Sequence, residues 1–193
     1  MVSIEEIAGV DILCSDKTGT LTKNDLIIGD VRPLNGFEDA DVLLIGTLAS
    51  SEEGSDAIDN AIITYAKKNE KIAEDLSQYK SLAFEPFDPI SKRTEAKIED
   101  SEGRRFQAAK GAPQVILSLL NNKDMISSEI DEIVNAFAFN GFRSLGVGKT
   151  DSKGVWHYVG LIAFYDPPRE DSADTIKTAN EMGVKVKMVT GDH

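Results

Sequence analysis

One segment of the sequence has residue types that suit phosphate chemistry. Residues 16–22 (DKTGTLT) begin with an aspartate and continue with three threonines and a glycine. The carboxylate of Asp16 could act as a nucleophile, since aspartates form covalent intermediates in phosphoryl transfer. Gly19 allows the backbone to approach a ligand closely, and successive loop amides can surround phosphate oxygens. These features predict a phosphate-binding loop with Asp16 as its reactive group; the alternative is an ordinary loop rich in turn formers.

Two short apolar segments end in loops of this kind. Residues 10–15 (VDILCS) have the composition of a buried strand and stop at Asp16. Residues 184–189 (VKVKMV) follow a helical pattern over 172–182 and end at 190–192 (TGD). A helix before the second strand indicates a βαβ unit, and parallel sheets bind ligands beyond the carboxyl ends of their strands. We therefore expect both loops at one edge of a parallel sheet.

The central part of the sequence has a different pattern. Four segments have helical periodicity or helix-start residues: 39–50, 56–68, 113–120 and 127–139. Five segments are typical of strands, the last four forming two hairpins: 26–31, 94–98, 105–109, 144–149 and 156–164. A Ser-x-x-Glu capping box also predicts a short helix over 4–8. We expect an antiparallel α+β domain inserted into a parallel α/β domain, with the chain divided into 1–30, 31–160 and 161–193.

Composition excludes several classes of function. The 193 residues carry a net charge of −12, which argues against a nucleic-acid partner. A single cysteine, Cys14, and two histidines exclude an intrachain disulfide and a Cys- or His-rich metal site. No apolar stretch approaches the ~18–20 residues that a membrane helix needs, and the N-terminus does not resemble a signal peptide. We expect this polypeptide to be soluble and cytoplasmic.

Five motifs in order along the chain resemble those of the P-type ATPases, the cation pumps that pass through an aspartyl-phosphate. They are 16–22 (DKTGTLT), 87–93 (FDPISKR), 110–113 (KGAP), 166–169 (DPPR) and 190–192 (TGD). The residues around them are most similar to those of plasma-membrane proton pumps. The resemblance implies a haloacid-dehalogenase-like, Rossmannoid parallel sheet, only partly contained in this sequence. An inserted α+β nucleotide-binding domain with an antiparallel sheet would interrupt it.

The resemblance also implies a set of site residues, with ATP and Mg²⁺ as cofactors. Asp16 would be the phosphoacceptor and would hold Mg²⁺ together with Thr18. The phosphate-binding residues would be Lys17, Thr18, Thr190, Gly191 and Asp192. The nucleotide-binding residues would be Asp59, Phe87, Lys110, Gly111, Arg143, Leu145 and Asp166. Taken without the resemblance, Phe87 suits a core position, Asp59 a polar helix face and Arg143 a solvated surface.

Thr18 distinguishes two enzymatic alternatives. Phosphatases of the haloacid dehalogenase type carry a second aspartate at this position, whereas a threonine cannot act as a general acid or base near neutral pH. We therefore expect a persistent aspartyl-phosphate rather than fast phosphatase turnover. A free-standing phosphatase and a nucleotide-binding module without chemistry remain the alternatives.

The resemblance implies partners outside this sequence. They are the pump's actuator domain, its membrane helices and a further segment of the phosphorylation domain with a catalytic lysine and a magnesium-binding aspartate. The nucleotide and phosphorylation domains would lie on the cytoplasmic side of the membrane. Because this sequence lacks the further segment, we expect the isolated polypeptide to bind ATP but to turn it over weakly or not at all.

Overall fold

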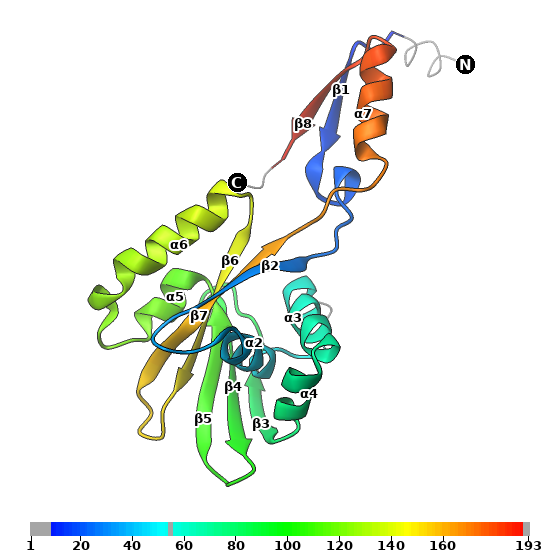
Figure 1. The fold of residues 1–193 in the computed structure, drawn as a ribbon. Coiled ribbons are helices and arrows are strands. Elements are labelled where there is room, and N and C mark those ends of the chain that lie inside the picture. Colours follow the sequence, from blue (N-terminus) through cyan, green and yellow to red (C-terminus); the bar gives the residue numbers. More distant parts are fainter. Residues whose placement is uncertain (1–8, 54–55, 191–193) are drawn as a thin grey trace. The chain divides into compact units, whose positions relative to one another are not determined.

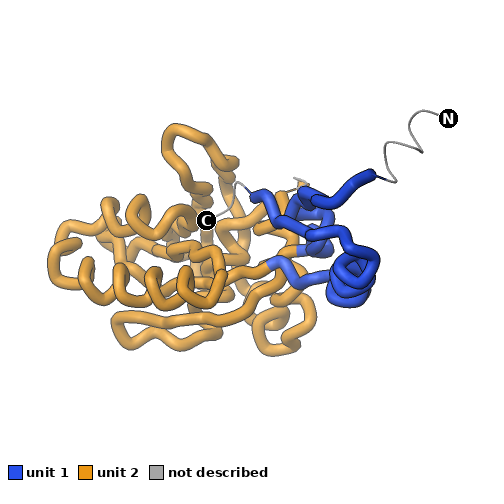
Figure 2. Tube along the Cα trace, turned by 90° about the horizontal axis from the view of Figure 1, so that it is seen from above, with its two compact units in different colours: residues 1–25, 166–193 blue, residues 26–165 orange. Residues whose placement is uncertain are grey.

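The computed structural model describes residues 9–53 and 56–190, and it divides the chain into two compact units (Figure 2). Unit 1 combines residues 1–25 with 166–193, and unit 2 comprises Leu26–Tyr165. The short helix expected over 4–8 lies outside the described residues. Within the described ranges, no helix has both the length and the apolar composition needed to cross a membrane.

Unit 1 contains a two-stranded parallel sheet. Strand β1 (Ile12–Asp16) pairs with β8 (Lys185–Val189), so that Asp16 lies opposite Val189. The irregular segment η1 (Lys17–Leu21) follows β1, and helix α7 (Ser172–Glu181) precedes β8 (Figure 1). This is the parallel arrangement that the two apolar segments predicted, and the carboxyl ends of both strands lie at the same edge.

Unit 2 is built on a six-stranded antiparallel sheet with the order β2-β7-β6-β5-β4-β3. Its strands are β2 (Ile27–Pro33), β3 (Tyr79–Glu85), β4 (Arg93–Asp100), β5 (Arg105–Gly111), β6 (Arg143–Thr150) and β7 (Trp156–Tyr165). Its helices are α2 (Asp39–Leu48), α3 (Ala57–Lys68), α4 (Glu70–Leu76), α5 (Pro113–Ser118) and α6 (Ser127–Phe139), with a short turn η2 (Lys123–Met125). The two hairpins expected from the sequence are β4–β5 and β6–β7.

Helices cover both faces of this sheet (Figure 1). On one face, α2, α3 and α4 bury a core that includes Val42, Ile62 and Ile72. On the other face, α5 and α6 bury a second core that includes Ile116 and Ile130. All five of these side chains are at most 1% exposed, so the burial of apolar area on both faces is the main stabilising contribution to unit 2.

Strand β7 contributes to both cores because of a β-bulge. Gly160 lies opposite Val147 and Tyr158 lies opposite Gly148, so Val159 has no partner on β6. The extra residue reverses the alternation of side chains along the strand. Tyr158 and Leu161 consequently both face the α5–α6 core, and the strand is buried over nearly its whole length.

Two elements were not expected from the sequence, strand β3 and helix α4. Strand β3 is the edge strand of the sheet and is exposed along most of its length, so it lacks the apolar alternation that marks a half-buried strand. Helix α4 has seven residues, of which only Ile72 is buried. The unit boundaries lie at 25/26 and 165/166 rather than at 30/31 and 160/161, because β2 and β7 pair up to Ile27 and Tyr165 and both belong to unit 2.

Candidate functional site

Asp16 is the last residue of β1, and it is exposed. Its side chain accepts a hydrogen bond from the backbone N–H of Lys17 at 2.8 Å. Gly19 adopts φ +76°, a left-handed conformation that costs glycine least, and this lets the chain turn sharply after the strand. The carboxylate therefore stands at the carboxyl edge of the sheet, at the start of a tight loop, as expected.

The loop after Asp16 is held by Thr22, whose side chain is buried. The Thr22 hydroxyl accepts from the backbone N–H of Gly19 at 3.1 Å and lies 2.5 Å from Oδ2 of Asp166, to which it donates. The other oxygen of Asp166 accepts from the backbone N–H of Asp25 at 3.2 Å. Arg169 N–H adds a bond to the carbonyl of Leu21. Asp166 was expected among the nucleotide-binding residues; in the structure its carboxylate links two chain segments of unit 1.

The second phosphate loop begins at Thr190, directly after β8. Because Asp16 pairs with Val189, Thr190 follows at the same edge of the two-stranded sheet. Gly191 and Asp192 lie outside the described residues. Lys17 and Thr18 are both partly buried in η1, directly after Asp16.

In unit 2, several expected nucleotide residues share one face of the sheet. Lys110 on β5 lies opposite Val147 on β6, and Val147 belongs to the core beneath α2, α3 and α4. Arg143 and Leu145 precede Val147 at two-residue intervals on the same strand, so all three point to this face. Arg143 is exposed at the start of β6, whereas Leu145 is half-buried against the core.

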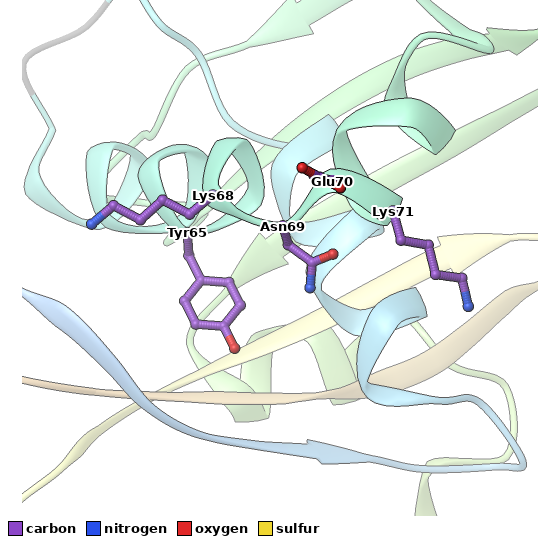
Figure 3. A pocket seen from close by; sticks show the side chains of 5 residues that line it. All are labelled: Tyr65, Lys68, Asn69, Glu70 and Lys71. Atoms are coloured by element: carbon purple, nitrogen blue, oxygen red, sulfur yellow. The ribbon is translucent and has the colours of Figure 1, made fainter.

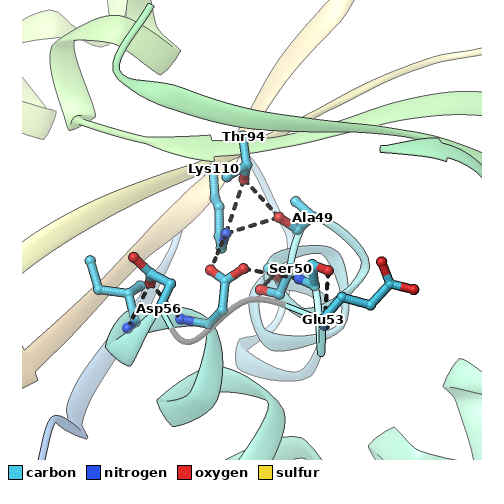
Figure 4. Close-up of polar contacts among 10 residues, drawn as sticks. Ala49, Ser50, Glu53, Asp56, Thr94 and Lys110 are labelled. Atoms are coloured by element: carbon cyan, nitrogen blue, oxygen red, sulfur yellow. Dashed lines mark hydrogen bonds and ion pairs between the residues drawn. The ribbon is translucent and has the colours of Figure 1, made fainter. Parts of the chain in front are cut away.

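Lys110 and Asp59 form a buried ion pair. Nζ of Lys110 lies 2.6 Å from Oδ1 of Asp59, and the two side chains are only 2% and 8% exposed. Burial lowers the pKa of the Lys110 ammonium, and the neighbouring Asp59 carboxylate opposes this shift. Both residues were expected to line a nucleotide pocket; in the structure they form an ion pair with each other and are buried (Figure 4).

Phe87 is 57% exposed and is not a core residue. It lies in the segment between β3 and β4, where the Asp88 side chain accepts from the backbone N–H groups of Ile90 and Ser91. These bonds lower the pKa of the Asp88 carboxyl, the bond from Ser91 having the largest effect. The aromatic ring is thus accessible on a segment with its own ordered turn.

Gly111 accounts for the position of this segment. A Cβ atom at Gly111 would lie 2.4 Å from the carbonyl oxygen of Lys92 and 2.7 Å from Cβ of Arg93. The next residue, Ala112, donates its N–H to the same Lys92 carbonyl at 3.2 Å. Only glycine leaves room for this close approach, so Gly111 anchors the end of the Phe87 segment.

Sequence reasoning missed Thr94, and it missed the partner of Thr22, whose hydroxyl was expected to donate to phosphate oxygens. Thr94 starts β4 and lies opposite Lys110, to whose ammonium its hydroxyl is 2.9 Å away. Symmetric pairing about the β4–β5 turn would have placed Thr94 there, so the signal was present in the hairpin. Thr22 is bonded to a residue 144 positions away, and no local pattern predicts such a partner.

An open hollow of about 450 Å³ lies at the junction of α3 and α4 (Figure 3). It is lined by Tyr65, Lys68, Asn69, Glu70 and Lys71. None of these residues belongs to the motifs described above. The side chain of Asn69 is already engaged, since its Oδ1 accepts from the N–H of Ile72 as the cap of α4. We assign no function to this hollow.

Comparison with known proteins agrees with this arrangement. The family model of haloacid dehalogenase-like hydrolases matches residues 10–193. The whole chain is 53% identical to a protein of Methanocaldococcus jannaschii named as a cation-transporting ATPase, of which it covers 24%. Over 98% of its length it is 42% identical to plasma membrane ATPase 1 of Saccharomyces cerevisiae, of which it covers 21%. A protein of Leishmania donovani named as a proton ATPase is 42% identical over 99% of the chain, which covers 20% of it.

The chain thus spans less than a quarter of the length of these relatives. Its Asp16 loop, its parallel strand pair and its separate antiparallel unit agree with the family match. The chain belongs to the haloacid dehalogenase-like hydrolases, and the relatives it matches along its whole length are P-type ATPases.

Proposed function

We propose that Asp16 accepts the γ-phosphoryl group of ATP and that the chain is the nucleotide-binding and phosphoryl-accepting part of a cation pump. The observation that carries this proposal is the exposed Asp16 carboxylate at the carboxyl edge of the parallel sheet, level with the strand end that leads into Thr190. A carboxylate oxygen would attack the γ-phosphorus, the bond to the β-phosphate oxygen would break, and ADP would leave. The product is an acyl phosphate on Asp16.

ATP would bind to unit 2. The exposed ring of Phe87 offers a face for adenine, and base–aromatic stacking contributes ~1–3 kcal/mol. Arg143, exposed at the start of β6, would bind phosphate oxygens, for which a guanidinium is well suited. Gly111 fixes the segment that carries Phe87, and Leu145 packs beneath the same face. Because the chain is strongly acidic, with a net charge of −12, it needs such local cations to bind an anionic ligand.

The residues of the Asp16 loop fit a magnesium ion that is shared with phosphate. Mg²⁺ prefers oxygen ligands and is usually held by one or two carboxylates together with substrate phosphates and water. Asp16 supplies one exposed carboxylate, and the backbone carbonyl of Thr18 is the second expected ligand. Bound there, the ion would neutralise charge on the transferring group. The oxygens of the transferring phosphoryl group would be bound by Lys17, Thr190, Gly191 and Asp192.

Thr18 favours a pump over a phosphatase. A threonine beside the acyl phosphate cannot activate water, so the general-base acceleration of ~10²–10⁴-fold that a second aspartate provides is missing. A long-lived phosphoenzyme can be coupled to a conformational step, as ion transport requires. The names of the relatives support a cation, and among cations a proton, as the transported ion. Further partners would be the actuator domain, the membrane helices and the rest of the phosphorylation domain, with this chain on the cytoplasmic side.

Acid-stable phosphorylation tests the proposal. The chain is extended by the C-terminal segment that follows the matching region in the Methanocaldococcus jannaschii relative, and is incubated with Mg²⁺ and γ-labelled ATP. We expect labelling that hydroxylamine removes and that Asp16→Asn abolishes. Asp11→Asn, at the opposite end of the same strand pair, is the matched control and should leave the label unchanged. Labelling that survives Asp16→Asn would refute the proposal, and rapid p-nitrophenyl phosphate turnover would favour the phosphatase.

A further inference from the structure

The turn that joins helix α6 to strand β6 is a Schellman motif. The backbone N–H of Phe142 donates to the carbonyl of Phe137 at 2.9 Å, and the N–H of Gly141 donates to the carbonyl of Ala138 at 2.9 Å. These two bonds define the motif, and Gly141 is its first residue beyond the helix cap. Gly141 has φ +76°, the left-handed conformation that the motif requires. Hydrogen bonds therefore fix the path of the chain from the end of α6 to Phe142.

The ring of Phe142 is packed by three elements of unit 2. Its centroid lies 6.4 Å from that of Phe137 on α6, an apolar contact that often accompanies the motif. On β7, the ring of Tyr165 lies 5.6 Å away, centroid to centroid. Gly29, the bulged residue of β2, leaves room for both rings, because a Cβ there would lie 3.0 Å from Tyr165 and 3.3 Å from Phe142. The side chain of Phe142 is thus held together with its backbone.

Arg143 comes directly after this fixed residue. It is the first residue of β6 and lies opposite Phe164 on β7. The end of a strand frays more easily than its middle, so the residue before it also determines where its backbone lies. That residue is Phe142. The Schellman motif therefore helps to determine which positions the exposed side chain of Arg143 can reach.

We propose that Gly141 and Phe142 are positioning residues for the binding of nucleotide phosphates. They hold the backbone of Arg143 at the start of β6, and neither of them touches the nucleotide. A guanidinium binds phosphate oxygens through a rigid fork of donors, so a small displacement of its anchor weakens the contact. This inference rests on the proposed contact between Arg143 and the phosphates of ATP.

The effect should be confined to the phosphates. Strand β6 pairs with β5 only from Gly146 onward, so the start of β6 is not bonded to the strand that lies between it and β4. Phe87, the proposed partner of adenine, lies in the segment between β3 and β4. A displacement of Arg143 should therefore leave the binding of the base unchanged.

The test uses Gly141→Ala with a matched control. Alanine is disfavoured in the left-handed conformation, and no atom lies within 4 Å of its added Cβ, so the change perturbs the backbone without altering the packing. Gly154→Ala is the control, because Gly154 has φ +79°, has equally open space, and lies in the turn at the other end of β6. Gly141→Asn is a milder variant, since asparagine also occurs at this position of the motif.

Affinities for ATP and for adenosine are measured by calorimetry at a temperature at which circular dichroism shows every variant to be folded. We expect Gly141→Ala to weaken ATP binding roughly tenfold, as for the loss of a hydrogen bond to a charged group, and to leave adenosine binding unchanged. Gly141→Asn should retain most of the ATP affinity, and Gly154→Ala should change neither affinity. Equal losses for the two ligands in Gly141→Ala would overturn the inference, as would an ATP affinity equal to that of Gly154→Ala.

A double-mutant cycle tests whether the effect passes through Arg143. Arg143→Met removes the guanidinium, so adding Gly141→Ala to it should change ATP affinity by less than about twofold. An undiminished loss in the double variant would show that Gly141 acts by another route and would overturn the inference.

Amide hydrogen exchange provides a measurement that needs no nucleotide. Gly141→Ala should accelerate exchange of the Phe142 amide, which donates to Phe137 in the motif, whereas Gly154→Ala should not. If the unaltered chain binds no ATP, the proposed function fails while this measurement still tests the motif. Unchanged exchange at Phe142 in Gly141→Ala would overturn the positioning role itself.

Discussion

Replacing Thr22 with valine should loosen the loop that carries Asp16. The substitution keeps the shape of the side chain but removes the hydroxyl that donates to Asp166 at 2.5 Å and accepts from the Gly19 N–H at 3.1 Å. A hydrogen bond to a charged group contributes ~1.5–3 kcal/mol, and the amide of Gly19 can find water in its place because Gly19 is exposed. We therefore expect a loss of about 2 kcal/mol in local stability.

Hydrogen exchange measured by mass spectrometry can follow this loss in unit 1. The only tryptophan, Trp156, lies in unit 2 and would not report on the loop. A local free-energy change of about 2 kcal/mol corresponds to roughly 30-fold faster exchange in peptides from residues 16–25. Thr20→Val is the matched control, because Thr20 is an exposed threonine of the same loop. Equal exchange in the two variants would show that the Thr22–Asp166 bond does not hold the loop.

Three further predictions concern unit 2. Gly160→Ala should destabilise it by ~1–3 kcal/mol in urea unfolding followed by tryptophan fluorescence, because the added Cβ would overlap the carbonyl oxygen of Arg32; an unchanged midpoint would contradict this packing. Phe87→Ala should weaken ATP binding about tenfold or more, whereas Phe139→Ala, which removes a 92% exposed ring of the same type, should not; equal titrations would remove Phe87 from the site. Two backbone N–H groups hold the pKa of Asp88 below its ordinary 3.8, so its stabilisation of the turn is present above pH 3.8 and is lost as the pH falls through the lower folded value. Amide protection in this turn should therefore differ between the native chain and Asp88→Ala at neutral pH and converge in acid; a difference that persists there would contradict the assignment.

Much of the fold followed from local patterns. The β4–β5 and β6–β7 hairpins were predictable because turn residues separate strand-like segments in the sequence. The conformational preferences of turn residues act over only a few positions, so no distant partner is needed. Strand β3 was not predictable, because an edge strand buries little and so shows little pattern. The bulge at Val159 was also hidden, since β7 is apolar on both faces and its sequence cannot show where the alternation reverses.

The candidate site likewise has parts that the sequence determined locally and parts that depend on tertiary packing. The sequence by itself determined the Asp16 loop, because a strand followed by a glycine-containing polar turn is specified within a few residues and needs no distant partner. Only the tertiary structure decided that Lys110 and Asp59 face each other, since this pair forms when α3 packs on the sheet. It likewise decided that Asp166 binds Thr22, 144 residues away. A buried charge takes whichever partner packing brings near it, and packing is a property of the whole chain.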